Sequence, residues 1–540
     1  MLFNSYTFIF FFLPVVAAVF WAAGQRSKEM ALLWLTAASL LFYAWWRPVN
    51  VFLIAPSILV NFALARGLER TRDDRPGLTR LLLVSGIVFN LCFLGYFKYL
   101  NFFAGVVNDM FGAGYVLTQL ILPLGISFIT FQKIAFLVDV AAGRTDRFTI
   151  RDYALFVLFF PQLIAGPIVH YREMMPQFRV ASCRFDATDT SVGIALFSFG
   201  LAKKLLLADP LSTIVQPIYA QSAAGLPQSM TDAWIAALGF TLQIYFDFSG
   251  YTDMALGIAR MFGIKLPMNF NSPLKATSII DFWLRWHVSL TRFLTAYIYN
   301  PISLALTRRR MAQGKPVFGG KNTTASAFLI LLVMPTVLTM LVSGIWHGAG
   351  YTYIAWGLMH GLLLCVNHLW RLLRPRFWPH AASYQRWFRL PAFLLTFGAV
   401  VFAMVLFRST TIGGAFLLWK GMVGAFGITV PAAVFARLGD AAAWLAALGI
   451  VPAWTSGSLF LEAVLRIAVL LFIALALPNT LEILGRYEPA LGYRPPKNPA
   501  WLQQRLAWQP NSAWAVGLAG ISLAGLLSLG QLSEFLYWQF

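Results

Sequence analysis

The chain is built from apolar runs that are long enough to cross a lipid bilayer. The clearest of them cover residues 2–23, 30–46, 49–65 and 81–97. A helix needs about 20 apolar residues to span the hydrocarbon layer of a membrane. The sequence therefore predicts an all-α, polytopic integral membrane protein.

The composition supports this interpretation. Of the 540 residues, 59% are hydrophobic and only 11% are charged, and the mean hydropathy is +0.69. Soluble domains carry roughly 25% charged residues, so most of this chain faces something other than water. We expect one integral unit, with N-terminal helices in residues 1–115, a central core in 116–370 and C-terminal helices in 371–540.

The positive charge has a pattern of its own. The formal net charge is +20, but the Lys and Arg residues fall mostly in short turns between apolar runs, such as 66–80. Such turns lie on the cytoplasmic side of a membrane. Binding to nucleic acid needs a continuous basic face instead, so we expect no nucleic-acid partner.

Two further segments are interrupted. The run 116–140 is broken by Pro123 and Gly125, and the run 154–169 contains two prolines and a glycine. Non-helical backbone at membrane depth is tolerated only around protein or a water-filled cavity, so we interpret 154–169 as a re-entrant segment. Counting doubtful segments, we expect about 11 to 14 embedded helices. The other runs are 192–207, 234–264, 325–343, 353–370, 459–478 and 513–529.

Two Trp-His pairs lie in sequence that is predicted to be at membrane depth. They are Trp286-His287 and Trp346-His347. An ionisable side chain inside a bilayer is costly, so it indicates a functional site. We assign His360 to packing.

The charge of the surrounding loops positions His347. The loops 307–321 and 371–389 are both basic and therefore cytoplasmic. Two apolar runs lie between them, so His347, which connects these runs, lies deep in the membrane or toward its outer face. Three glycines nearby leave room for a ligand or a neighbouring backbone: Gly344, Gly348 and Gly350.

The segment 281–294 reads as one helix around His287. In that helix Arg285, Ser289 and Arg292 share a face, because they are four and three residues apart. His287 then points about 160° away from this face, at 100° per residue. We expect His287 to face a cavity while the two arginines meet headgroups, partners or ligand phosphates.

Two carboxylates lie in the middle of the run 234–264. Asp247 and Asp253 are six residues apart and do not share a face of a continuous helix. A break at Gly250 would let both line one cavity. Alternatively, they bond to backbone groups or pair with Arg260. We treat both as supporting residues.

The pair Lys203-Lys204 lies in an apolar run and has two interpretations. The lysines are interfacial anchors, or they contact an anionic ligand from the cytoplasmic side. The sequence does not favour one over the other.

Several enzyme signatures are absent. There is no HxxxD, GxSxG, HExxH or GxxxxGK[ST] motif, which argues against soluble acyltransferases, serine hydrolases, zincins and NTPases. The three cysteines lie far apart without metal-ligand spacing, so we expect no metal site. No strong internal repeat is visible, which weakens a secondary transporter without excluding it.

Nine short motifs resemble the membrane-bound O-acyltransferase family, and within it the bacterial alginate O-acetylase type. They occur in order in roughly the first 370 residues: YAWWR at 43–47, GYFKYLNF at 95–102, LPLGISF at 122–128, LIAGP at 163–167, AKKLLLAD at 202–209, YFDFSGYTDMA at 245–255, NFNSP at 269–273, FWLRWHVSL at 282–290 and SGIWHGAGYTYIAWGLMHG at 343–361.

The resemblance implies a multi-helix bundle with a tunnel between cytoplasmic and outer funnels, and a catalytic core in 116–370. It implies that His347 is the catalytic histidine and His287 the second active-site position. The supporting residues that we assign in these motifs are Asp247, Asp253, Trp346, Trp286, Ser289 and Arg285.

The resemblance also implies a membrane O-acetyltransferase in the bacterial inner membrane. The donor would be cytoplasmic acetyl-CoA, with no bound cofactor, and His347 would be the general base. Expected partners are membrane lipid and an exported polysaccharide, alginate- or cellulose-like, or a periplasmic protein that accepts or transfers acetyl. The alternatives are a non-enzymatic polysaccharide exporter, or O-acylation of peptidoglycan, teichoic acid or a protein.

One departure from the family pattern follows the second histidine motif. Related sequences usually continue to an Arg-Asp-Tyr, whereas this chain has Thr295-Ala296-Tyr297. The departure bears on the contacts with acceptor and partner more than on the chemistry.

Overall fold

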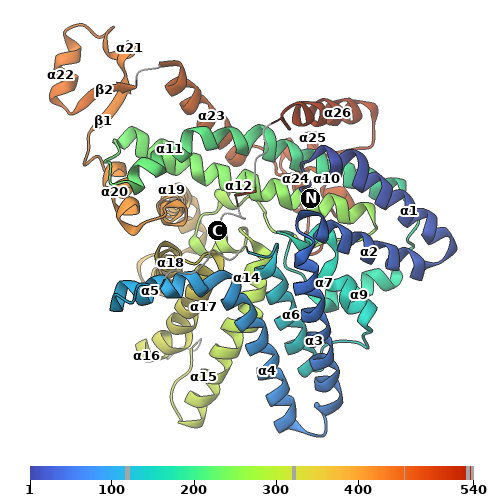
Figure 1. Cartoon of the computed structure of the whole chain (residues 1–540). Helices are drawn as coiled ribbons and strands as arrows, with labels where there is room; N and C mark the ends of the chain where they lie inside the picture. Colours follow the sequence, from blue (N-terminus) through green and yellow to red (C-terminus); the bar gives the residue numbers. More distant parts are fainter. Residues whose placement is uncertain (116–121, 319–323, 455–456, 531–534, 537–540) are drawn as a thin grey trace. The chain divides into compact units, whose positions relative to one another are not determined.

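A computed structural model describes residues 1–115, 122–318, 324–454, 457–530 and 535–536, and this part of the chain is mostly helical (Figure 1). The prediction of a polytopic helical membrane protein is confirmed. In the described ranges, eight helical segments are long and apolar enough to cross a membrane: Phe8–Arg26, Lys28–Trp46, Val49–Thr71, Pro76–Phe111, Ala187–Ala223, Ala325–His347, Ala381–Arg408 and Ser458–Ala476. Eight is fewer than the predicted number of embedded helices, because that prediction also counted shorter or more polar segments.

The chain packs into two compact units that are interleaved in sequence. The first comprises Met1–Ala202, Gly250–Asn269 and Thr480–Leu532, and the second comprises Lys203–Ser249, Phe270–Asn479 and Ser533–Phe540. These boundaries differ from the three sequence ranges predicted above. The expectation of one integral unit stays a prediction.

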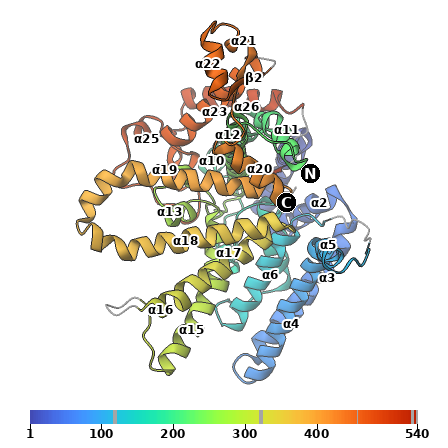
Figure 2. The same ribbon diagram turned by 90° about the vertical axis from the view of Figure 1, so that its left-hand side faces the viewer.

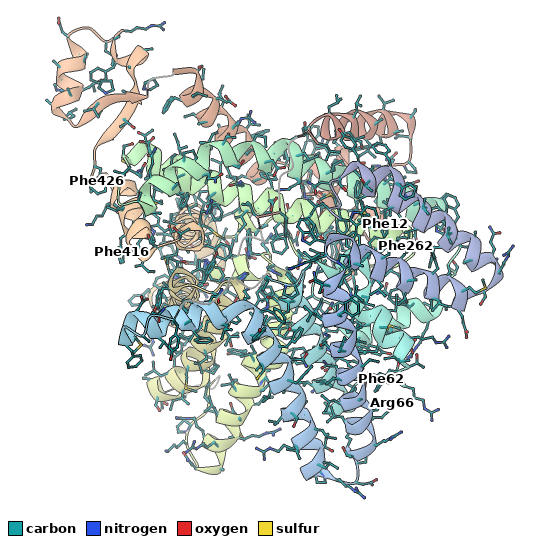
Figure 3. The ribbon with its side chains drawn as sticks, viewed as in Figure 1. Phe12, Phe62, Arg66, Phe262, Phe416 and Phe426 are labelled. Carbon is teal, nitrogen blue, oxygen red and sulfur yellow. The ribbon has the colours of Figure 1, made fainter. Side chains whose placement is uncertain are left out.

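Hairpins of long apolar helices form the first unit. Figure 1 shows α3 (Val49–Thr71) and α4 (Pro76–Leu94) running side by side, and α6 (Ile126–Ala141) packs against both. At the end of α3, Arg66 pairs with Glu69 at 2.7 Å and its guanidinium lies 5.6 Å from the centre of the Phe62 ring (Figure 3). The helices of this unit are η1 (Phe8–Phe12), α1 (Leu13–Arg26), α2 (Lys28–Trp46), α3 (Val49–Thr71), α4 (Pro76–Leu94), η2 (Gly95–Tyr99), α5 (Leu100–Phe111), α6 (Ile126–Ala141), α7 (Ile150–Leu158), α8 (Phe160–Leu163), α9 (Tyr171–Val180), α10 (Ala187–Ala202), α24 (Thr480–Ile483), η8 (Gly485–Tyr487), α25 (Trp501–Arg505) and α26 (Ser512–Leu527).

Both predicted interruptions are present. Helix α6 begins at Ile126, directly after Gly125, whose φ of +67° is a conformation that glycine tolerates; residues 116–121 of that run lie outside the described residues. The later run is split between α7 and α8 at Phe159, which leaves the helical region. That this second segment is re-entrant stays a prediction.

The second unit is built around the hairpins of α17 (Met334–His347), α18 (Tyr351–Phe377) and α19 (Ala381–Arg408). Figure 2 shows α18 and α19 as a long antiparallel pair, and α17 packs closely on α18. Helix α12 (Met230–Met261) begins in this unit and continues without a break into Gly250–Asn269, which belongs to the first unit. The other elements of this unit are η3 (Lys203–Ala208), η4 (Asp209–Leu211), α11 (Ser212–Ala223), η5 (Pro273–Lys275), α13 (Ile279–Trp283), α14 (Val288–Leu294), η6 (Thr295–Tyr299), α15 (Asn300–Ala312), α16 (Ala325–Phe328), η7 (Leu329–Val333), α20 (Ile412–Met422), β1 (Ile428–Pro431), α21 (Ala432–Phe435), α22 (Ala441–Ala447), β2 (Ile450–Trp454) and α23 (Gly457–Ala476).

Glycines make the close contact between α17 and α18 possible. A Cβ atom on Gly344 would collide with the backbone oxygen of Tyr353, and one on Gly348 would collide with the Tyr353 ring. Small residues at helix interfaces let membrane helices approach in this way. The prediction that a neighbouring backbone approaches these glycines is confirmed at Gly344.

A small two-stranded sheet interrupts the helical fold in the second unit. Strands β1 and β2 pair in parallel, with Ile428 opposite Ile450, and enclose α21 and α22 in sequence. Figures 1 and 2 both show this segment beyond the end of α20. The sequence of this region mixes apolar runs with Gly, Pro and isolated charges, which fits a connecting segment rather than a span.

Candidate active site

His347 is the last residue of α17. Its side chain is buried, and its ring centre lies 5.1 Å from that of Trp356 on α18 and 5.2 Å from that of Phe407 on α19. Trp346, the preceding residue, is also buried. The end of one helix and the sides of two others therefore fix the position of this imidazole.

His287 lies in a turn between α13 and α14. Its backbone is left-handed, with φ 43° and ψ 52°, and its side chain is 0% exposed. The ring of Phe248 on α12 stands edge-on to it, with centres 4.8 Å apart. A non-glycine residue with positive φ is uncommon, and such strain is found most often at functional sites.

The structure brings the two Trp-His pairs together. The imidazole centres of His287 and His347 are 6.3 Å apart, with the rings inclined at 65°. The ring of Trp346 also reaches His287, at 6.1 Å. Two imidazoles at this separation are close enough for both to act on one reacting group, one on its proton and the other on its oxygen.

The prediction of one helix through His287 is wrong. The helix ends at Trp283 and a new one begins at Val288, so Arg285 does not share a helical face with Ser289 and Arg292. Four residues of turn separate the two helices. The calculated angle between His287 and that face therefore has no meaning here.

Arg285 forms hydrogen bonds that hold this turn in place, and its predicted contact with a headgroup, partner or ligand phosphate stays a prediction. Arg285 donates a hydrogen bond from Nε to Asp281 at 2.7 Å and from a terminal nitrogen to the backbone oxygen of Asn271 at 3.4 Å. The Arg285 backbone oxygen accepts from the amide of Asn271 at 2.9 Å. Ser289 is buried in the first turn of α14.

Trp286 belongs to an aromatic cluster below the turn. Its ring stacks on Phe282 at 5.5 Å and stands edge-on to Phe270 at 5.1 Å. Tyr245 of α12 completes the contact at 6.5 Å. The cluster makes Trp286 a packing support of the site.

Asp247 is held by a buried lysine that the sequence left ambiguous. Lys204 Nζ lies 2.7 Å from Asp247 Oδ1 and 2.7 Å from Asp209 Oδ1, and Lys204 is only 2% exposed. Lys204 is therefore part of an internal ion cluster and not an interfacial anchor. A buried charge is tolerated when it is paired in this way.

Asp253 is not brought together with Asp247 on one face. Helix α12 has no break at Gly250, so the two carboxylates point to different sides of a continuous helix. Asp253 is buried in the first unit. The proposed pairing with Arg260 is also wrong, because Arg260 pairs with Asp189 at 2.7 Å.

A third histidine joins the aromatic cluster. His360 is 0% exposed, and its Nδ1 accepts a hydrogen bond from Trp283 Nε1 at 3.3 Å. Trp356 lies next to both His360, at 4.8 Å, and His347, at 5.1 Å. The packing role assigned to His360 fits this position. Neither Phe407 nor Trp356 was predicted as a neighbour of His347.

The C-terminal segment also reaches this site. The amide of Leu536 donates to Asp247 Oδ2 at 3.2 Å, and the ring of Phe535 lies 5.7 Å from that of Phe248. Phe248 in turn contacts His287. Phe535 thus packs against Phe248, the ring that contacts the His287 imidazole.

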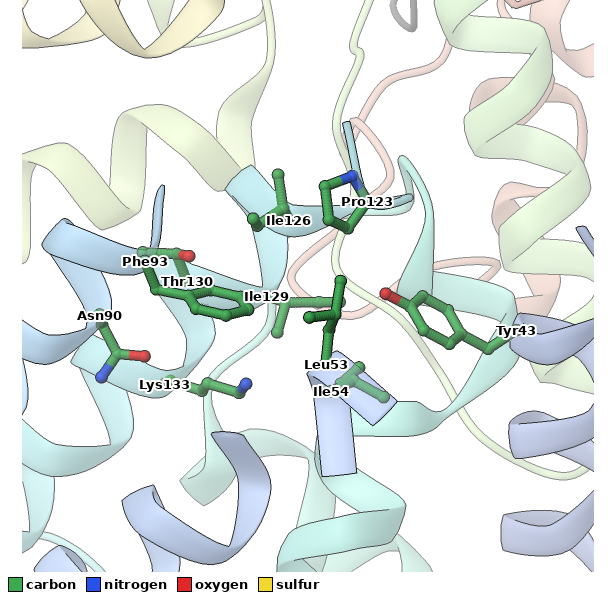
Figure 4. Close-up of a pocket in the computed structure, with 10 residues that line it drawn as sticks. All are labelled: Tyr43, Leu53, Ile54, Asn90, Phe93, Pro123, Ile126, Ile129, Thr130 and Lys133. Carbon is green, nitrogen blue, oxygen red and sulfur yellow. The ribbon is translucent and has the colours of Figure 1, made fainter. Parts of the chain in front are cut away.

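The first unit contains a small cavity of its own. It is lined by apolar side chains and by four polar residues of α2, α4 and α6 (Figure 4): Tyr43, Asn90, Thr130 and Lys133. Lys133 is 2% exposed and donates to Ser57 Oγ at 2.6 Å. Its neighbours are neutral, unlike those of Lys204.

Comparisons with known proteins agree with the class that the fold defines, a multi-pass membrane protein. The model of the membrane-bound O-acyltransferase family matches residues 141–314. A peptidoglycan O-acetyltransferase of Helicobacter pylori is 37% identical over 80% of this chain and 81% of its own length.

Two other types of relative were found. A Pseudomonas aeruginosa protein named "Probable alginate O-acetylase AlgI" is 36% identical over 78% of this chain and 75% of its own. A teichoic acid D-alanyltransferase of Bacillus subtilis is 27% identical over 54% of this chain and 69% of its own. The chain belongs to the membrane-bound O-acyltransferase family and is an acyltransferase.

Proposed function

We propose that this protein is an O-acetyltransferase of the bacterial inner membrane, which passes acetyl from cytoplasmic acetyl-CoA to hydroxyl groups of an exported polysaccharide. The relatives named for acetyl transfer to alginate and peptidoglycan support an acetyl group and a carbohydrate acceptor. The observation that carries the proposal is the buried pair His287 and His347, whose ring centres are 6.3 Å apart.

The chemistry requires help from a base, because a sugar hydroxyl is a weak nucleophile at neutral pH. His347 takes the hydroxyl proton as the oxygen attacks the thioester carbonyl, a contribution of about 10²- to 10⁴-fold. The carbon–sulfur bond then breaks, and the leaving thiolate takes the proton from the imidazolium. His287 donates a hydrogen bond to the carbonyl oxygen while its negative charge develops.

A site between two sides of the membrane allows the acetyl group to cross without its carrier. The basic loops favour a cytoplasmic donor side, and His347 lies at the opposite end of α17 from the basic segment 307–321. We infer an alginate- or cellulose-like acceptor, reached directly or through a periplasmic acetyl-transferring protein. Peptidoglycan and teichoic acid are the other acceptors that the relatives' names suggest.

The test compares acetyl content of isolated exopolysaccharide from cells that carry wild-type protein, His347→Ala or His287→Ala. We expect His347→Ala to lose acetylation by at least about 100-fold, with the protein inserted at wild-type level. His368→Ala, on α18, is the matched control and keeps acetylation. Wild-type acetyl content in His347→Ala contradicts the proposal.

The donor is tested separately in membrane vesicles. Acetyl-CoA labelled in its acetyl group is supplied on the cytoplasmic face, and label is followed into polysaccharide and into free acetate. Wild-type vesicles are expected to release CoA in step with labelling of the glycan. Labelling of peptidoglycan alone would replace the exported polysaccharide as acceptor.

A further inference from the structure

Arg408 is the last residue of α19 and follows directly after Phe407. The Phe407 ring lies 5.2 Å from that of His347 and 5.4 Å from that of Tyr353. A permanent positive charge therefore lies one residue from the wall of the proposed active site. None of the sequence motifs described above contains it.

Two aromatic rings lie close to the guanidinium. The Arg408 Cζ atom lies 5.7 Å from the ring centre of Tyr219 on α11 and 6.0 Å from that of Phe240 on α12. A guanidinium within about 6 Å of a ring centre is attracted by the ring electrostatically. These contacts involve no oxygen acceptor, so the five N–H donors of the guanidinium still require hydrogen-bond partners.

Those donors have no protein acceptor among the described residues. Arg408 is half-buried, and the structure places neither a carboxylate within 4.0 Å nor a hydrogen-bond acceptor against it in that part of the chain. Other half-buried arginines of this unit differ: Arg285 pairs with Asp281 and Arg466 with Glu462, whereas Arg374 lies over the ring of Tyr384 and its Nε has no hydrogen-bond partner among the described residues. What distinguishes Arg408 is its place next to Phe407, which contacts His347. An unpaired guanidinium beside a reaction site suggests that its partner is a ligand.

A second group beside Arg408 also lacks a partner. Tyr219 is 4% exposed, and its hydroxyl has no hydrogen-bond partner within the described ranges. Buried hydroxyls are nearly always bonded, so each exception needs an explanation. A ligand that carries anionic oxygens would satisfy both the Tyr219 hydroxyl and the guanidinium.

We propose that Arg408, with Tyr219, binds an anionic group of the acceptor, a sugar carboxylate or a polymer phosphate, and so selects acidic glycans for acyl transfer. This inference rests on the proposed function. The planar fork of arginine matches the two oxygens of such a group. The residue determines specificity and takes no part in the bond changes.

The charge distribution along α19 separates this group from the donor. The helix has 28 residues and is therefore about 42 Å long. Its other end lies within the basic segment 371–389, which would attract the phosphates of a cytoplasmic donor. Arg408 stands alone at the far end, next to the His347 wall, which favours the acceptor.

A structural role is the competing explanation. A cation at a helix C-terminus interacts favourably with the helix dipole, and Arg408 occupies that position. Such a role does not depend on which acceptor is present. The measurement must therefore compare acceptors and not only activities.

The experiment uses membranes that contain the full chain and saturating acetyl-CoA. Initial rates are measured against two acceptors of equal length, an oligouronate and a neutral cello-oligosaccharide, and against a phosphodiester-linked glycan oligomer. For Arg408→Gln we expect KM for the acidic acceptor to rise about ten- to a hundredfold, the size of one lost charged hydrogen bond. The value of kcat, and KM for the neutral acceptor, stay at wild type.

Three further variants sharpen the result. Arg408→Lys keeps the charge but not the fork, and is expected to recover part of the lost affinity. Tyr219→Phe keeps the ring and removes the hydroxyl, so it raises KM for acidic acceptors only. Arg466→Gln on α23, where Arg466 pairs with Glu462 at 2.8 Å on the surface, is the control with wild-type constants.

Each other result overturns the inference. Equal losses on acidic and neutral acceptors assign Arg408 to helix stability, and unchanged KM for every acceptor removes it from the site. A rise in KM for acetyl-CoA instead assigns the anion to the donor. If KM rises for the oligouronate, Arg408 binds a carboxylate; if KM rises for the phosphodiester oligomer, it binds a phosphate. Failure of the proposed function is recognised separately, because His347→Ala would then still acetylate either acceptor.

Discussion

The ring of His287 stands 6.3 Å from that of His347, and His287 reaches this position only by adopting a left-handed backbone. Such a conformation costs of order 1–3 kcal/mol for a residue with a side chain. The ion pair of Arg285 with Asp281 holds the turn in place. The break between the two helices therefore places the His287 imidazole beside that of His347.

Replacement of His287 by Gly and by Ala separates strain from function. Both variants lose the imidazole, so both are expected to lose acyl transfer. Glycine tolerates positive φ and relieves the strain, whereas alanine keeps it. We therefore expect His287→Gly to be more stable than His287→Ala by about 1 kcal/mol, measured as thermal unfolding in detergent.

The usual order of these two residues is the reverse, because glycine loses more conformational entropy on folding. A lower unfolding midpoint for Gly than for Ala would show that the backbone at this position is not strained. Gly350 gives a control for the method, since its backbone is extended with φ −169° and a Cβ there meets nothing closer than 3.5 Å.

The ion cluster of Lys204 is expected to respond asymmetrically. Lys204→Met leaves the carboxylates of Asp247 and Asp209 buried together, which costs about 3–5 kcal/mol for a broken buried pair. Asp247→Asn leaves a neutral Lys204–Asp209 pair and costs less. Thermal unfolding of the purified variants should place Lys204→Met lowest.

Lys420→Met, on an exposed position of α20, is the control for loss of a lysine. Asp247→Asn combined with Lys204→Met should recover part of the stability, because it removes one of the two unpaired charges. Equal midpoints for the two single variants would show that Lys204 does not hold Asp247 in its charged form.

The site residues that could be predicted from the sequence are ionisable side chains in apolar segments, because burying them costs free energy. His287 and His347 stand out because an ionisable group inside a bilayer requires a reason, and the structure brings them together. The same argument applied to Lys204 and Asp247, opposite charges in neighbouring apolar runs, would have paired them. Their contact at 2.7 Å follows from the cost of burying either charge alone.

The features that sequence reasoning missed depend on contacts between residues far apart in the chain. The turn at 284–287 contains no glycine or proline, and its spacing suits a helix, so nothing local marks the break. It is fixed by Arg285 and by the hydrogen bond from Trp283 to His360, which lies far along the chain. The contact of Phe407 with His347 could not be predicted either, because the sequence of an apolar helix does not show which residues its phenylalanines contact.

Gly344 is expected to be intolerant of substitution. Gly344→Ala forces a methyl group onto the backbone oxygen of Tyr353, so α17 and α18 must separate. Overpacking of this kind costs about 1–3 kcal/mol, and it displaces His347 at the end of α17. We expect transfer to fall at least about tenfold, since small misplacement of reacting groups is costly. Gly350→Ala, six residues further on, should retain activity, and similar losses in both would contradict the contact.

Phe535 is expected to keep water out of the site. Its ring packs on Phe248, which backs His287, and the neighbouring Leu536 amide is fixed by Asp247. Phe535→Ala leaves a gap behind Phe248, so the backing loosens and water can compete with the acceptor hydroxyl. We therefore expect transfer to glycan to fall while release of free acetate from the donor rises.

The ratio of acetate released to acetyl transferred is the measurement, because a general loss of folding lowers both products together. Phe535→Leu fills most of the gap and should give a ratio near wild type. Phe426→Ala, in the loop after α20 (Figure 3), is the control for loss of a phenylalanine outside this cluster. An unchanged ratio in Phe535→Ala, with normal transfer, would show that Phe248 holds its position beside His287 without the C-terminal segment.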